Sequence, residues 1–154
     1  MSPPRRFSLS SSSVRNVFAD HGLRCTQQRM AIYKALLDCD THPTADELYD
    51  MVARNGNADL SMATIYNTLE VFCQKGLCQK LSGGNGCCRF DGDTHDHLHF
   101  RNVKTGEIHD VPDEIGKMLL NSIPQDVINN IEKQMGVQLT RLNVELIGTP
   151  NPTS

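Results

Sequence analysis

Apolar residues in the first half of the chain recur with the period of an α-helix, and each stretch follows a side chain suited to cap a helix. Ser13 precedes the first stretch and Thr26 precedes the second. Thr44 and Glu47 have the spacing of a capping box before the third stretch, and Ser61 opens the fourth. The pattern therefore predicts successive helices, the last two joined by a short linker as a helix-turn-helix requires.

A Gly-rich segment follows these helices and changes the pattern to that of β-structure. It lies between residues 77–81 and 87–90, two runs that can pair as the strands of a hairpin. Helices followed by such a hairpin predict a winged helix-turn-helix.

The second half of the chain alternates strand and helix patterns. A second hairpin is predicted over residues 98–103 and 107–111, and Pro112 and Pro124 each precede a helical pattern. Residues 137–147 are rich in β-branched and apolar side chains, which predicts a last strand. This half is too small to bury its own apolar surface well, which favours pairing with a second copy.

These patterns predict an α+β fold with two domains. Pro and Ser near the N-terminus are typical of a flexible tail. The predicted parts are a tail over residues 1–13, a winged-helix domain over 14–91, a polar hinge over 92–97, a small α/β domain over 98–148 and a second tail over 149–154.

Charge is distributed unevenly, although the whole chain of 154 residues carries a net charge of only −3. Residues 1–90 contain ten Lys or Arg and eight Asp or Glu, whereas residues 91–154 contain five and ten. A basic half joined to an acidic half indicates two modules with different partners. Because no apolar run approaches the ~20 residues that span a bilayer, and no signal-peptide pattern opens the chain, we expect a cytoplasmic protein with no membrane partner.

The densest group of possible metal ligands lies between residues 91 and 99. Asp91, Asp96, His97 and His99 fall within nine residues, and His97 and His99 project to the same face of a predicted strand. Imidazoles and carboxylates without a thiolate favour iron, manganese or zinc over copper(I) or an iron–sulfur cluster. A solvated polar loop is the alternative interpretation.

Several stretches, in order along the chain, carry a resemblance to a known family. They are HGLRCTQQR (21–29), HPTADELY (42–49), SMATIYNTL (61–69), RFD (89–91) and HDHLH (95–99). The chain resembles the ferric uptake regulator (Fur) family of bacterial metal-dependent transcription regulators over roughly residues 14–148. The resemblance implies an N-terminal winged-helix DNA-binding domain, a hinge and a C-terminal α/β dimerisation domain.

The family's regulatory metal site, carried over position by position, falls on His42, Asp91, His97, His99 and Asp110. The resemblance implies that one cation bound there joins the two domains and fixes the angle between them. Metal binding then favours the conformer that binds DNA. The corepressor that the resemblance implies is Fe2+, for which Mn2+ or Zn2+ can substitute.

Other possible metal sites are judged from the same resemblance. His95 and Asp96 are candidates for an additional ion. Many relatives hold a structural zinc with two Cys-x-x-Cys pairs, but this chain has Asn102 and Thr105 at the first pair's positions and no cysteine after Cys88. No four-cysteine zinc site is therefore expected.

Candidate DNA contacts lie on and before the predicted recognition helix. Thr64, Tyr66 and Asn67 belong to the helix that would enter the major groove, where Tyr66 can contact a thymine methyl and Asn67 an adenine edge. Arg24 lies where relatives reach the minor groove. Tyr66 also fits an apolar stripe with Ile65, so partial packing in the core is the alternative for this side chain.

The expected function is a homodimeric, metal-dependent repressor of an AT-rich inverted repeat, controlling metal homeostasis or oxidative-stress genes, and not an enzyme. A peroxide sensor is one alternative, since peroxide-responsive relatives have Asp at the position of Asp110, where iron-uptake regulators usually have Glu. Another is a small metallohydrolase, although five protein ligands would leave little room for a substrate and an activated water. A third is a DNA-binding module that needs no metal.

Overall fold

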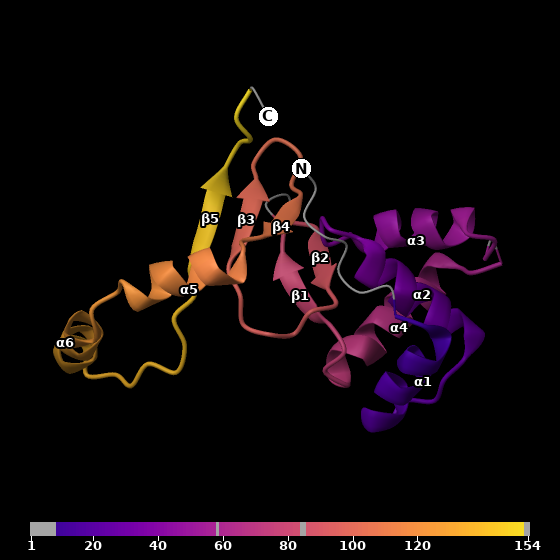
Figure 1. Ribbon diagram of the computed structural model, residues 1–154, viewed down its shortest axis with the longest axis horizontal. Helices are drawn as coiled ribbons and strands as arrows, with labels where there is room; N and C mark the ends of the chain where they lie inside the picture. Colours follow the sequence, from indigo (N-terminus) through magenta and orange to yellow (C-terminus); the bar gives the residue numbers. More distant parts are fainter. Residues whose placement is uncertain (1–8, 58, 84–85, 153–154) are drawn as a thin grey trace.

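The computed structural model describes residues 9–57, 59–83 and 86–152 (Figure 1). Its first half is a group of packed helices, and its second half combines strands with two further helices. The N-terminal helices are α1 (Ser11–Asp20), α2 (Gln27–Asp38), α3 (Ala45–Arg54) and α4 (Met62–Gln74).

Three of these helices begin at the predicted capping residues. The side chain of Thr26 caps α2 and that of Ser61 caps α4. At α3 the hydroxyl of Thr44 accepts a hydrogen bond from the N–H of Glu47, whose carboxylate accepts one from the N–H of Thr44. The predicted capping box is therefore confirmed.

The prediction for the first helix is wrong at its N-terminus. Ser10, not Ser13, is the N-cap, and its hydroxyl accepts a hydrogen bond from the N–H of Ser13 at 3.2 Å. A run of serines offers several similar caps, and the helix uses the earlier one. Residues 11–13, predicted as part of the tail, are helical, and residues 1–8 of that tail lie outside the described residues.

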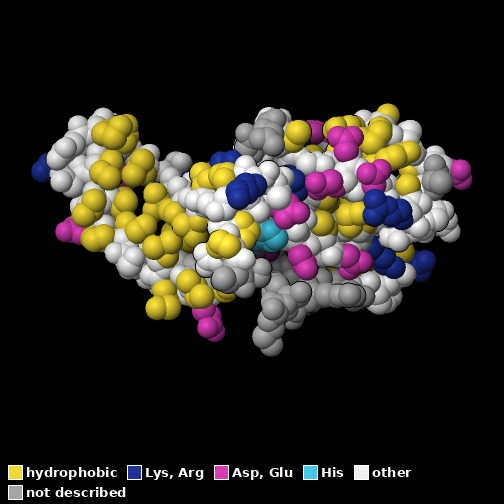
Figure 2. Space-filling model, turned by 90° about the horizontal axis from the view of Figure 1, so that it is seen from above, with side chains coloured by type: hydrophobic (Ala, Val, Ile, Leu, Met, Phe, Trp, Pro, Cys, Tyr) yellow, Lys and Arg dark blue, Asp and Glu magenta, His cyan; other side chains and the backbone are white. Residues whose placement is uncertain are grey.

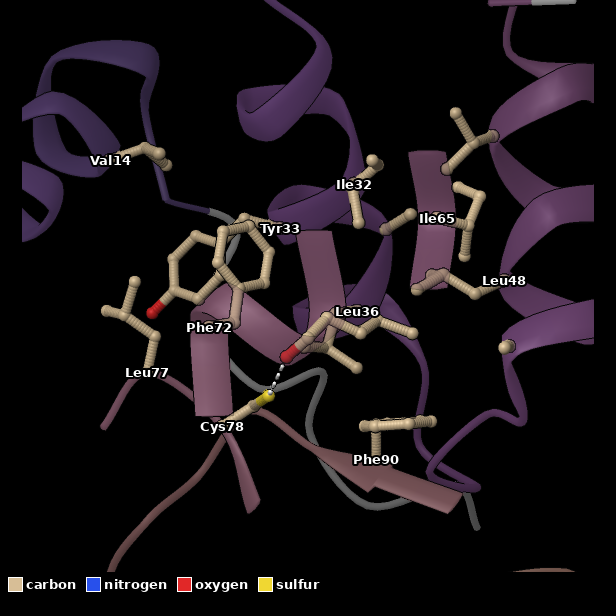
Figure 3. Packing of buried hydrophobic residues seen from close by; sticks show 14 of the residues in the cluster. Val14, Ile32, Tyr33, Leu36, Leu48, Ile65, Phe72, Leu77, Cys78 and Phe90 are labelled. Carbon is tan, nitrogen blue, oxygen red and sulfur yellow. Dashed lines mark hydrogen bonds between the residues drawn. The ribbon is translucent and has the colours of Figure 1, made fainter. Parts of the chain in front are cut away.

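Aromatic rings join α1, α2 and α4 in the core of the first half. The ring centroids of Phe18, Tyr33 and Phe72 lie 5.3 to 5.8 Å apart, a separation at which aromatic pairs gain about 0.5–1.5 kcal/mol beyond burial. Leu48 of α3 and Ile65 of α4 are fully buried in the same cluster (Figure 3). One face of α4 is therefore held in this core, and the other face of the helix lies on the surface of the molecule.

The predicted wing is an antiparallel hairpin of β1 (Gln79–Ser82) and β2 (Cys88–Asp91). Residues 84–85 of its turn lie outside the described residues. Strand β2 also contacts the segment before α3: the N–H of Phe90 donates to the carbonyl of Pro43 at 3.0 Å, and Arg89 forms a β-bridge with Thr44. The wing is therefore attached to the loop that contains His42.

The elements of the second half are β3 (His99–Asn102), β4 (Ile108–Asp110), α5 (Asp113–Asn121), α6 (Gln125–Met135) and β5 (Glu145–Gly148). The strands form a sheet in the order β4-β3-β5, with β3 antiparallel to β4 and parallel to β5. Helices α5 and α6 follow Pro112 and Pro124 as predicted.

The last strand is shorter than predicted. Residues 137–144 have no regular structure, and strand pairing starts only at Glu145, opposite His99. Because β3 is four residues long, it offers partners to residues 145–148 alone, and β-branched side chains do not form a strand without a partner.

Apolar side chains remain exposed over the second half. Helix α6 buries none of its described residues, and the exposed fractions of Met118 and Met135 are 71% and 68%. Figure 2 shows hydrophobic side chains spread over this end of the molecule, where Figure 1 places α5 and α6. Within the described residues, no helix is both long and apolar enough to cross a bilayer.

Candidate metal centre

Five side chains from separate parts of the chain meet between the wing and the sheet of the second half. His42 precedes α3, Asp91 ends β2, and His97 lies in the loop before β3. His99 is the first residue of β3, and Asp110, its partner across the sheet, ends β4. One possible ligand atom of each residue lies within 4.8 Å of those of the other four.

Asp110 is surrounded by imidazoles. Its Oδ1 lies 2.8 Å from Nε2 of His42, 2.7 Å from Nε2 of His97 and 3.3 Å from Nε2 of His99. The other carboxylate, Asp91, is 3.1 Å from each of the last two rings through Oδ2 and 3.4 Å from Nδ1 of His42 through Oδ1. Each of the two acids therefore lies within 3.4 Å of a nitrogen of all three rings.

The cluster is shielded from solvent, and its charges perturb one another. Burial would raise the pKa of Asp91 and Asp110, but hydrogen bonds from the histidines hold the pKa of both carboxyls well below their usual range. Hydrogen bonds to Asp110 and Asp91 raise the pKa of His97 to about 10. Burial would lower the pKa of His99, yet the same two carboxylates raise it. Without a cation, the two acids thus favour the protonated forms of His97 and His99.

The backbone orients two of the ligands. Nδ1 of His97 faces the carbonyl of His95, which can only accept, so this nitrogen donates and Nε2 is left facing the carboxylates. Oδ1 of Asp91 accepts a hydrogen bond from the N–H of Asp93 at 2.9 Å. Such outer contacts fix the orientation of side chains that bind metals.

This donor set has the chemistry of a site for a borderline divalent cation. Three imidazole nitrogens are neutral donors once deprotonated, and two carboxylates supply the compensating negative charge. The rings of His97 and His99 have centroids 4.4 Å apart, and both contribute to the cluster. The prediction that both residues lie on a strand is wrong for His97, which lies in the loop before β3. The residues present therefore fit an ion such as Fe2+, Mn2+ or Zn2+.

A family model described as the ferric uptake regulator family matches residues 20–146. The chain belongs to this family. Solved structures agree with the assignment: a zinc-bound manganese uptake regulator is 26% identical with a TM-score of 0.67 and covers 90% of this chain and 98% of its own. The Vibrio cholerae ferric uptake regulator is 25% identical, also with a TM-score of 0.67, and covers 89% and 99%. The predicted α+β fold, with a winged helix-turn-helix before a small α/β part, is thus confirmed.

Curated relatives of this Fur-family chain are named peroxide-responsive repressor PerR. The Staphylococcus saprophyticus protein is 43% identical over 101 residues, which are 66% of this chain and 65% of that protein. The protein from Staphylococcus aureus strain Mu50 is 43% identical over 89 residues, which are 58% and 60%. The match thus spans somewhat less than two thirds of either relative's length.

The pair suggested for an additional ion lies outside the cluster. The side chain of His95 is 94% exposed, and its Nδ1 is 2.9 Å from the Asp93 carboxylate. Asp96 is 93% exposed, and its Oδ1 accepts a hydrogen bond from Arg141 at 3.2 Å. The structure therefore does not bring these two side chains into the cluster of five residues.

The candidate DNA contacts lie on the surface of the winged helix. Tyr66 is 52% exposed and Asn67 is exposed on the same helix, so part of the Tyr66 side chain is accessible on the surface. Thr64 is half-buried, and its hydroxyl contacts that of Ser61 at 2.9 Å. Arg24 is exposed just before α2.

Sequence reasoning gave no role to Arg89, which belongs to the RFD motif. Its buried guanidinium contacts the main chain of Thr41 and His42 and the carboxylate of Glu47. The sequence signal for a buried arginine was its place in a short strand pattern beside the apolar Phe90. A buried arginine is rarely unpaired, so this place also indicated that Arg89 has an acidic or carbonyl partner. Its partners lie more than 40 positions away, so they could not be predicted.

Proposed function

We propose that this Fur-family chain is a metal-dependent DNA-binding repressor whose ligands are His42, Asp91, His97, His99 and Asp110. The observation that supports this most directly is the meeting of their five donor atoms within 4.8 Å. Chance seldom gathers three imidazoles and two carboxylates in a buried place, because unpaired charges are costly to desolvate.

The proposed ligands come from both halves of the chain, so an ion bound to them would join the two halves. His42 belongs to the helical half, and His99 and Asp110 belong to the sheet of the second half. Held together on one cation, these residues would keep the two halves in one relative position. That conformer would be stabilised by the difference in its affinity for the cation, and the operator would bind the same conformer.

DNA binding is proposed for the exposed face of α4 and the segment before α2. Tyr66 and Asn67 would read base edges in the major groove, with Thr64 beside them, and Arg24 would enter the minor groove. The net positive charge of residues 1–90 favours binding to phosphates, and affinity should fall steeply with salt. A homodimer would present two such helices to an AT-rich inverted repeat, a partner found in the cytoplasm.

Fe2+ is the proposed ion, with Mn2+ or Zn2+ able to substitute. The family is defined by iron uptake regulation, and one solved relative is a manganese uptake regulator that binds zinc. A site of imidazoles and carboxylates suits all three ions, so availability in the cell decides among them.

Substitution of His42 tests the proposed coupling. His42→Ala should weaken both metal binding and metal-dependent operator binding, because it removes the ligand that ties the helical half to the centre. Couplings of this kind are typically worth about 1–3 kcal/mol, so operator affinity should fall about 5–150-fold. Titrations of Mn2+ by calorimetry and of labelled operator by fluorescence anisotropy, with and without metal, measure the two effects.

His109→Ala is the matched control for that variant. His109 is next to a proposed ligand in β4, but its side chain is 42% exposed and lies 3.5 Å from Glu107 rather than in the cluster. It should bind metal and operator like the parent chain. Equal operator affinity of His42→Ala and the parent in both conditions would contradict the coupling.

A peroxide sensor is the second candidate, favoured by the relatives named PerR and by aspartate at position 110. When bound, ferrous iron would supply the one-electron chemistry that turns peroxide into an oxidant. His42 and His97 each place a ring nitrogen within 3 Å of the same Asp110 oxygen, so both rings would border that ion. An oxidised imidazole is a poorer ligand, and the operator would then be released.

Mass spectrometry distinguishes this candidate from a plain iron-sensing repressor. After micromolar peroxide, the iron-loaded chain should gain one oxygen atom on His42 or His97 and lose operator affinity. The manganese-loaded chain should stay unmodified. Unmodified histidines in the iron-loaded chain, with operator binding retained, would eliminate the peroxide sensor.

A metallohydrolase is less well supported by the same geometry. In the proposed function all five acidic and imidazole side chains of the cluster would hold one ion, whereas hydrolysis needs an open position together with a general base.

A further inference from the structure

The side chain of Arg89, on β2, is buried beside the segment that carries His42. Its exposed fraction is 7%, and its Nη1 donates to the carbonyl oxygens of Thr41 at 3.4 Å and of His42 at 3.1 Å. Nη1 and Nη2 also donate to the two carboxylate oxygens of Glu47, at 3.1 and 3.3 Å. The guanidinium is therefore held between one acid and two consecutive carbonyl groups.

These contacts restrain the backbone on both sides of His42. The carbonyl of Thr41 belongs to the peptide plane before the Cα of His42, and the carbonyl of His42 belongs to the plane after it. A single nitrogen that binds both oxygens restrains the angle between the planes. His42 has a φ of 52°, in the left-handed region that residues other than glycine seldom adopt without support.

Strand β2 thus contributes to the centre in two ways. Residues two apart in a strand project to the same side, so Arg89 and the proposed ligand Asp91 both face the segment that contains His42. Glu47, which binds the guanidinium, also accepts a hydrogen bond from the N–H of Thr44 at 3.1 Å in the cap of α3. The arginine therefore connects the wing, the loop of His42 and the start of α3.

We propose that Arg89 is a positioning residue for the metal centre, which holds the backbone of His42 in the conformation that lets its ring reach the other ligands. This inference rests on the proposed function and deepens it, because it makes the wing strand part of the response to metal. Without the guanidinium, the backbone of His42 would relax and its ring would turn away from Asp110.

The test compares Arg89→Met with His42→Ala and with the double variant, using Co2+ alone as the probe. Loss of contacts that orient a ligand typically costs about 10–100-fold in metal affinity, and Arg89→Met should show a loss of this size. Its Co2+ absorption spectrum should change toward that of His42→Ala. The double variant should bind Co2+ no more weakly than His42→Ala, since Arg89 acts only through that ligand.

Lys80→Met is the matched control. It removes a cation from β1 of the same hairpin, and the exposed Lys80 pairs with Glu70 of α4 at 3.2 Å rather than with main-chain atoms of the loop of His42. It should leave the Co2+ affinity and spectrum unchanged. Parental Co2+ binding by Arg89→Met, or losses that simply add in the double variant, would overturn the positioning role.

Arg89→Lys keeps the test decisive if Arg89→Met does not fold. The lysine ammonium keeps the charge but cannot bind both carboxylate oxygens and both carbonyls at once. A folded Arg89→Lys chain, checked by circular dichroism, should lose affinity several-fold, and parental affinity would overturn the inference. If the parent chain itself binds no metal, the proposed function fails as well. If only the Arg89 variants match the parent, the inference alone fails.

Discussion

Protons and a cation compete for the same nitrogen atoms at the proposed centre. Because the pKa of His97 is raised from 6.5 to about 10, its contribution to the stability of the metal-free fold is complete below pH 6.5 and is lost as the pH rises through 10. The lowered pKa values of Asp91 and Asp110 act in the opposite direction. Their contribution is present above about pH 4 and is lost as the pH falls.

Metal binding should therefore release protons and strengthen with pH. A ring that is protonated at pH 7 must lose its proton before it can bind a cation, so the apparent affinity for Mn2+ should rise about tenfold per pH unit for each proton released. Calorimetry at pH 6.5 and 8.5, in buffers of different ionisation enthalpy, gives both the affinity and the number of protons.

The His109→Ala variant should show the same pH dependence as the parent, because His109 lies outside the cluster. An affinity that is independent of pH over this range, with no proton released, would mean that the histidines do not bind the ion.

Local signals predicted the elements well where a side chain acts on its own backbone. Thr44 and Glu47 satisfy the first N–H groups of α3 by themselves, so their spacing was sufficient to locate the helix. Ser13 was a poorer guide because neighbouring serines can do the same, and Ser10 is the cap instead. The length of β5 was not predictable, since it depends on how many residues its partner β3 offers.

The proposed centre was predictable as a set of residues only through the family resemblance. Residues 91–99 alone indicated a metal, but His42 and Asp110 are 68 positions apart, and only the fold brings Nε2 of one within 2.8 Å of the other. The role inferred for Arg89 could not be predicted from the sequence. It depends on hydrogen bonds to the main-chain oxygens of Thr41 and His42, and the residue types do not determine where those oxygens lie.

At the scale of the whole molecule, the two halves have unequal cores. Leu48 and Ile65 of the helical half are completely buried, whereas most of the large apolar side chains of α5, α6 and the segment before β5 are 37% exposed or more. Monomeric proteins seldom expose a large continuous apolar surface, so a second copy is the simplest cover for it. The symmetry of such a dimer would also suit an inverted repeat.

A charge placed in this surface should separate the two copies. Ile131 on α6 is 40% exposed, and Ile131→Asp would have to bury a carboxylate in the interface. We expect a dimer of the parent chain and a monomer of this variant at micromolar concentration in light scattering. Operator affinity should fall in the monomeric variant, because two recognition helices can address half-sites ~34–36 Å apart only when the copies are joined.

Asn130→Asp is the matched control. It adds the same charge at the adjacent position, which carries an exposed polar side chain, and this variant should remain dimeric. A parent chain that is monomeric with metal present would refute the dimer, and a dimeric Ile131→Asp would place the interface away from this face of α6.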